Sequence, residues 1–127
     1  MRRFTAALVA LPLVAALPVL AQSAGLSALK PGLWNVRFRD GTPQRRICVK
    51  TGRELVQLRH RGASCGRYVT ENGARSVTVQ YSCGGDGHGR SSFRVEDAQL
   101  VQIESQGVSN GRPFQFSAEA RRVGNCS

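Results

Sequence analysis

The chain has 127 residues, a formal net charge of +10 and four cysteines, and only 6% of its residues are aromatic. A chain of this length builds one domain with one modest core, which excludes a multidomain enzyme. Arginine carries nearly all of the positive charge, because Lys30 and Lys50 are the only lysines. Such a charge either favours polyanions as partners or reflects arginine spread over a solvated surface.

The first residues have the pattern of an export signal. A basic start is followed by an apolar run from Ala6 to Leu20, and Val19-Leu20-Ala21 offers a site for signal peptidase. We expect residues 1–21 to be a cleaved signal peptide, which leaves residues 22–127 as a single domain and lowers the formal charge to +8. A membrane anchor is the alternative, but two prolines interrupt the run and it is shorter than the roughly 20 residues that a spanning helix needs.

All four cysteines (Cys48, Cys65, Cys83 and Cys126) follow the expected signal peptide. An even number of cysteines in an exported chain predicts two disulfides, whereas a zinc site is disfavoured by the absence of a Cys-x-x-Cys pair. Residues 65–83 have the pattern of a β-hairpin that turns at Asn72-Gly73 with positive φ. Antiparallel strands around that turn bring the second and third cysteines face to face. Among the three formal pairings we therefore prefer Cys65–Cys83 and Cys48–Cys126.

The chain before this hairpin predicts two strands and a helix. Residues 22–29 are expected to be a loosely ordered leader. Residues 33–39 alternate between apolar and polar side chains, and residues 44–50 return as a second strand. Thr51-Gly52-Arg53-Glu54 matches a helix capping box, so we expect one short helix over residues 52–60.

The chain after the hairpin predicts three further strands. Residues 84–89 contain four glycines and are expected to be a mobile loop. Asn110-Gly111 is a second hairpin signal. Alternating apolar and polar side chains mark strands at residues 91–96, 100–107 and 114–123.

Together these segments predict an all-β domain with one short helix. We expect an antiparallel up-and-down meander of seven strands that forms a curved sheet or a partial barrel. A two-sheet sandwich is the alternative. The apolar face of the strands supplies the expected structural core: Trp34, Val36, Phe38, Phe93, Val101, Ile103, Phe114 and Phe116.

Several short motifs follow one another in a fixed order. They are Pro31-Gly32-Leu33-Trp34, Cys48-Val49 before the expected helix, Tyr81-Ser82-Cys83, and the closing segment from Arg121 to Cys126. In this order they resemble the bacterial domain-of-unknown-function family 3617, over nearly the whole chain after the signal. The resemblance implies a small exported four-cysteine domain of Gram-negative bacteria, hence the periplasm, and it implies no activity. The chain departs from the family pattern at Asn35 and Asn125, where acidic residues are common, and the segment from Trp34 to Cys48 is short.

No grouping of side chains in the sequence predicts catalysis. His60 is interpreted as charge at a helix end, and His88 lies in the glycine-rich loop. Asp86 and His88 suggest a metal loop with Cys83, but a sulfur in a disulfide does not ligate a metal. No serine lies in a nucleophile elbow. We therefore expect no catalytic residue, no metal and no cofactor.

Three basic clusters remain, at Arg45-Arg46, Arg59-His60-Arg61 and Arg121-Arg122. If Cys48 bonds Cys126, the first and third clusters lie near one another. Arg45, Arg46, Arg121 and Arg122 are therefore candidate anion-binding residues. Charge scattered over the surface is the alternative. Because aromatic residues are few, nucleic acid is disfavoured as a partner.

The sequence leaves more than one function open. The first hypothesis is a monomeric, non-catalytic binding module for an apolar or amphiphilic ligand or a protein partner. The second is a cell-envelope component that binds anionic lipid or polysaccharide through an arginine-rich surface. An enzyme of unrecognised type is the third.

Overall fold

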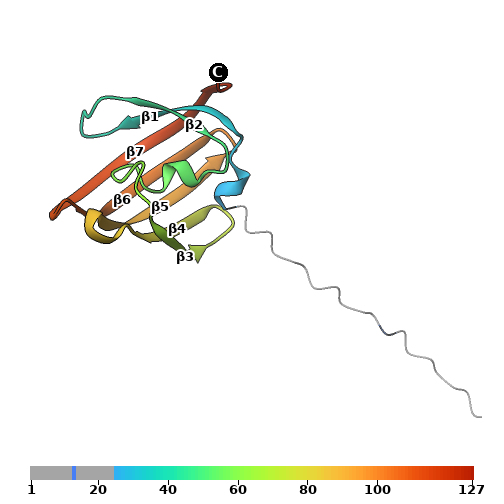
Figure 1. The fold of residues 1–127 in the computed structure, drawn as a ribbon. Coiled ribbons are helices and arrows are strands. Elements are labelled where there is room, and N and C mark those ends of the chain that lie inside the picture. Colours follow the sequence, from blue (N-terminus) through green and yellow to red (C-terminus); the bar gives the residue numbers. More distant parts are fainter. Residues whose placement is uncertain (1–12, 14–24) are drawn as a thin grey trace, which may run out of the picture.

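The computed structural model describes Leu13 and residues 25–127, so the expected signal peptide lies outside the described residues apart from Leu13. Within the described chain, seven strands form one antiparallel sheet (Figure 1), which confirms the predicted all-β class over the sandwich alternative. No helix in this part of the chain has both the length and the apolar character to cross a membrane. The strands are β1 (Gly32–Phe38), β2 (Arg45–Val49), β3 (Gly66–Asn72), β4 (Ser76–Ser82), β5 (Gly87–Asp97), β6 (Leu100–Ser109) and β7 (Arg112–Gly124).

The strand order departs from a simple meander at one place. In the sheet the order is β2-β1-β7-β6-β5-β4-β3, so each strand pairs with the next along the chain except β2 and β3. Strand β1 pairs with β7 instead, from Leu33 opposite Gly124 to Phe38 opposite Ala118. The sheet is therefore a partial barrel that is continuous through β1 and β7 and open between β2 and β3. Residues 50–65, which we call the crossing segment, connect these two edges.

The crossing segment lies over one face of the sheet, which we call the inner face (Figure 1). The predicted helix over residues 52–60 is wrong, because the segment forms one 3-10 turn, η2 (Arg53–Leu55), followed by further turns. Four consecutive residues, 55–58, are buried. In an α-helix four consecutive side chains point all round the axis, so a regular helix cannot bury them on one sheet face.

Two backbone carbonyl groups of the crossing segment accept hydrogen bonds from side chains of the sheet. The Ser91 hydroxyl donates to the Val56 carbonyl at 2.6 Å, and Arg45 Nη1 donates to the Leu58 carbonyl at 3.1 Å. Buried backbone polar groups need such partners, because an unpaired one costs about 1–3 kcal/mol. The crossing segment is thus fastened to the sheet by hydrogen bonds as well as by apolar packing.

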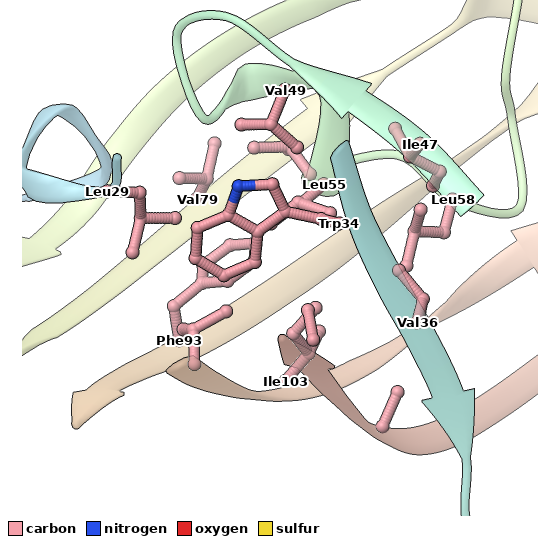
Figure 2. Close-up of a cluster of buried hydrophobic side chains, with 14 of the residues drawn as sticks. Leu29, Trp34, Val36, Ile47, Val49, Leu55, Leu58, Val79, Phe93 and Ile103 are labelled. Carbon is pink, nitrogen blue, oxygen red and sulfur yellow. The ribbon is translucent and has the colours of Figure 1, made fainter. Parts of the chain in front are cut away.

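Trp34 lies at the centre of the core between the sheet and the crossing segment (Figure 2). Its side chain is fully buried, and its indole Nε1 donates to the Lys30 carbonyl at 2.9 Å. The other expected core residues are also buried, except that Phe114 is half-buried and packs against the core. Leu29 is buried too, so the expectation of a loosely ordered leader is wrong at this position. Figure 2 shows these residues around the indole: Leu29, Val36, Ile47, Val49, Leu55, Leu58, Val79, Phe93 and Ile103.

Both predicted disulfides are confirmed. Cys48 in β2 is bonded to Cys126 after β7, and Cys65 at the end of the crossing segment is bonded to Cys83 after β4. Two disulfides are typical of proteins from oxidising compartments outside the cytoplasm. One disulfide therefore fastens each edge of the open sheet.

The two Asn-Gly signals behave differently. At Asn110-Gly111 both residues have positive φ, 51° and 74°, as a two-residue hairpin turn requires. At Asn72-Gly73 neither does, so the predicted positive-φ turn is wrong there, and a longer connection closes with the Gly73 N–H donating to the Ser76 carbonyl at 2.7 Å. A bulge between Val69 and Glu71 compensates for the shift in register. The second and third cysteines are therefore still brought together.

The glycine-rich residues 84–89 do not form one mobile loop. The 3-10 turn η3 (Gly84–Asp86) is followed at once by β5, which begins at Gly87. Gly89 lies directly against the buried Tyr81 ring, and a side chain at this position would overlap that ring. Glycine here therefore serves close packing within the sheet.

Candidate functional site

The open edge of the sheet exposes part of the core-facing surface. Every residue of β3 is exposed, including Tyr68 at 61% and Val69 at 54%. In the next strand, β4, the inward-facing Val77 and Val79 are buried. Because β3 has no partner on its outer side, its own apolar side chains are reachable from solvent.

A cavity of about 430 Å³ lies at this edge. The crossing segment, the inner face of β3 and β4, and the residues just before β1 form its walls. We call it the apolar groove. Its aliphatic lining is Leu26, Val56, Val69, Val77 and Val79, and Arg53, Arg67 and Tyr68 also line it.

A second, polar cavity of about 490 Å³ adjoins the first. Three arginines line it, and we call it the cationic hollow. Arg53, Cys65 and Arg67 line both cavities, so the two lie side by side. The charged residues that line the cationic hollow are Arg53, Glu54, Arg61 and Arg67.

The one carboxylate in the cationic hollow is committed to the backbone. Glu54 Oε1 accepts from the N–H groups of Lys50 at 2.9 Å and Thr51 at 3.2 Å, and Oε2 accepts from that of Gly52 at 3.0 Å. Partial burial opposes ionisation, but these backbone hydrogen bonds outweigh it and lower the pKa of the Glu54 carboxyl. Part of the predicted capping box is therefore present although the helix is not.

Among the residues that the structure describes, no carboxylate forms an ion pair with the three arginines of the cationic hollow. The ion pairs within the described chain involve Arg37, Arg94 and Arg121. Arg53 and Arg61 are exposed and lie in none of them. A guanidinium stays protonated at any physiological pH and offers five N–H donors. The cationic hollow therefore presents unneutralised positive charge beside an apolar surface.

Arg67 is oriented by a buried amide. Its Nη1 lies 3.5 Å from Gln57 Oε1. The Gln57 side chain is itself fixed, because its Nε2 donates to the carbonyls of His60 at 2.8 Å and Ala63 at 3.0 Å. The Arg67 guanidinium therefore contacts a rigid part of the crossing segment.

His60 holds the far end of the crossing segment to the sheet. The interpretation of His60 as a charge at a helix end is wrong, since the side chain is 5% exposed. Its Nε2 lies 2.9 Å from the Asp86 carbonyl and 3.1 Å from the Val108 carbonyl, so this nitrogen carries the hydrogen. Nδ1 lies 2.9 Å from the Tyr81 hydroxyl, which donates to it in the neutral imidazole. Burial raises the pKa of Tyr81 to about 12.

The structure separates the four predicted anion-binding arginines. Arg45 points inward, where it binds the Leu58 carbonyl and stacks over the Phe38 ring at 5.7 Å. Arg122 donates to the Pro31 carbonyl at 3.0 Å and to Asn125 Oδ1 at 2.6 Å. Both side chains therefore make contacts that hold the fold together.

The other two predicted arginines lie on the outer face of the sheet. Arg46 in β2 and Arg121 in β7 both pair with Asn35 of β1, so β1 lies between them. Both are exposed, and Arg121 lies 3.8 Å from Glu119. Their role in binding anions stays a prediction.

The sequence did not single out the arginines of the cationic hollow as a group. The sequence places Arg53 in a capping box, Arg67 in a hairpin and Arg61 in a basic cluster. Arg61 and Arg67, but not Arg53, lie near Cys65 in the sequence, and the disulfide fixes Cys65 at the open edge. Without the strand order, nothing in the sequence brings Arg53 to the same place.

Comparison with known proteins yields no match to a family model, a curated protein or a solved structure. Across Leu13 and residues 25–127, no group of three or more His, Cys, Asp and Glu side chains is arranged to hold a metal ion. The candidate site therefore rests on the geometry of the apolar groove and the cationic hollow.

Proposed function

We propose that this protein is a non-catalytic periplasmic module that binds an amphiphilic molecule in the apolar groove. The observation that carries the proposal is a groove with aliphatic walls, open to solvent, next to a cluster of arginines that form no ion pair within the described residues. Its volume of about 430 Å³ lies within the range of small-molecule sites, roughly 300–1,000 Å³. The groove accepts an alkyl chain while a polar end stays at the surface.

The walls of the groove are held in place before any ligand binds. The Cys65–Cys83 disulfide ties the crossing segment to β4, and the Ser91 hydroxyl holds the Val56 carbonyl. A preformed site loses less conformational entropy on binding than one that must order itself. This rigidity supports binding as the function of the groove.

The compartment belongs to the same proposal. The signal pattern of residues 1–21, the two disulfides and the resemblance to family 3617 support export to the periplasm. N-terminal sequencing of the protein from a periplasmic extract tests this point. The expected first residue is Gln22, and an intact Met1 in the cytoplasmic fraction would contradict it.

Native mass spectrometry of the protein purified from its own cell envelope tests binding. We expect an adduct of constant mass on the chain with both disulfides intact. Val69→Asp places a charge in the groove at a residue that is 54% exposed, and it should abolish the adduct. Val123→Asp is the matched control, because Val123 is 51% exposed and lies away from the groove. A chain that never carries an adduct, or equal loss in both variants, overturns the proposal.

A further inference from the structure

We infer that the ligand is a single-chain anionic amphiphile whose head group is bound by the arginines of the cationic hollow. The inference rests on the proposed function and adds the chemical class of the ligand. Its basis is that the two cavities adjoin and share the lining residues Arg53, Cys65 and Arg67. One molecule can therefore lie with its chain in the apolar groove and its head in the cationic hollow.

Charge selects the head group. Arg53, Arg61 and Arg67 surround the cationic hollow, and the carboxylate of Glu54 is already held by three backbone N–H groups. An added anion would be the first acidic partner of these arginines. A guanidinium binds carboxylate and phosphate oxygens in pairs, with short charge-assisted hydrogen bonds. A cationic head would be repelled, and a neutral head would leave the charge unbalanced.

Size selects the number of chains. The apolar groove has a volume of about 430 Å³, near the lower limit for small-molecule sites. Three of its lining residues, Val56, Val77 and Val79, belong to the buried core and are each no more than 5% exposed. There is room for one alkyl chain, whereas a two-chain phospholipid would leave its second chain in water.

The residues that bind the head are separable from those that hold the fold. The side chain of Arg53 makes no hydrogen bond in the described chain, and Arg67 makes one, at 3.5 Å, to Gln57. Both residues are exposed. The double variant Arg53→Gln/Arg67→Gln should therefore fold normally, which a thermal melt followed by circular dichroism checks.

Calorimetric titration, with every probe below its micelle concentration, tests the inference. The probes are dodecyl phosphate, dodecanoate, the non-ionic dodecyl maltoside and inorganic phosphate. We expect the two anionic amphiphiles to bind at least tenfold more tightly than dodecyl maltoside, and inorganic phosphate to bind far more weakly. The variant Arg53→Gln/Arg67→Gln should lose at least tenfold in affinity for dodecyl phosphate and less than twofold for dodecyl maltoside. The control Arg90→Gln/Arg112→Gln removes the same charge at two exposed residues that line neither cavity, and it should change neither affinity by more than twofold.

The outcomes separate the two proposals. If neither anionic nor non-ionic amphiphile binds, the proposed function fails and this inference fails with it. If both bind equally and the double variant changes neither, the groove binds ligand but the inferred head-group site is wrong. If the control variant loses as much affinity for dodecyl phosphate as the double variant, the overall surface charge attracts the anion and no specific site does. If inorganic phosphate binds tightly, the alkyl chain is not needed for binding. Each of these results also overturns the inference.

Discussion

The two edges of the sheet are consecutive strands of one chain, yet they have opposite surroundings. In β2 the inward-facing Ile47 and Val49 are almost fully buried, whereas β3 is exposed along its whole length. The difference arises from the crossing segment. It packs Leu55 and Leu58 into the core around Trp34 (Figure 2), whereas a long hydrogen bond of 3.5 Å, between Gln57 and Arg67, links it to β3. The crossing segment thus covers the β2 edge, which we call the sealed edge, whereas the β3 edge stays open and contains the apolar groove.

The open edge is also protected against pairing with another strand. A bulge between Val69 and Glu71 interrupts the regular backbone of β3, and charged side chains lie on either side of it. Bulges and charges on edge strands oppose edge-to-edge association. The comparison teaches that an edge can stay accessible to a small ligand without inviting aggregation.

The largest expected effects at the two edges are those of removing their disulfides. The Cys48–Cys126 bond joins residues 78 apart and the Cys65–Cys83 bond joins residues 18 apart. Loop-closure entropy predicts losses of about 4–5 and about 3 kcal/mol when the respective pairs are changed to serine. Urea unfolding of the two double variants measures this. Equal stability of Cys48→Ser/Cys126→Ser and the wild type would show that the sealed edge does not depend on its disulfide.

Truncation of aliphatic side chains should distinguish the edges next. Leu58→Ala removes a side chain that is 2% exposed, and we expect a loss of about 3 kcal/mol, since buried Leu→Ala changes cost about 2–5 kcal/mol. Val69→Ala at the open edge should change stability by less than about 0.5 kcal/mol. Urea unfolding again supplies both values. A loss at Val69 as large as that at Leu58 would mean that β3 is part of the core.

The polar fastening of the crossing segment should have an intermediate effect. Ser91→Ala leaves the buried Val56 carbonyl without its donor, so we expect a loss of about 1–3 kcal/mol. Ser92→Ala, on the opposite face of the same strand, is the control and should cost less, because Ser92 is half-buried and shares its hydrogen bond with Thr78. Stability is measured by urea unfolding. Equal losses would contradict the role assigned to Ser91.

The two hairpin turns should show the smallest difference. Gly111 has a φ of 74° and Gly73 does not have a positive φ. Gly111→Ala is therefore expected to cost about 1 kcal/mol, whereas Gly73→Ala should be neutral or slightly stabilising. Thermal melts resolve a difference of this size. The reverse order would mean that the two Asn-Gly signals have been assigned the wrong turn geometries.

Much of the fold could be predicted from the sequence. Alternation at Trp34, Val36 and Phe38 shows which side of a strand is buried, and the spacing of Cys65 and Cys83 around a turn gives their pairing. The pairings between consecutive strands follow the predicted meander, but the pairing of β1 with β7 could not be predicted. Alternation assigns a residue to a face but does not name the neighbouring strand, so the pairing of β1 with β7 has no local signal.

The crossing segment and the candidate site could not be predicted for a related reason. The capping box at Thr51 and Glu54 is a local signal for a helix, but burial of four consecutive residues overrides it. The arginines of the cationic hollow meet because the chain returns to the open edge at Cys65. Their grouping is a property of the tertiary structure.

The most direct test of the account is a methyl NMR titration with dodecyl phosphate. The central claim is that the open edge, and not the sealed one, admits the ligand. We predict that the methyl signals of Val56, Val69, Val77 and Val79 shift with a single saturable curve, while those of Ile47 and Val49 stay unchanged. Shifts at Ile47 and Val49, or no saturable shift at the four groove valines, would contradict the account.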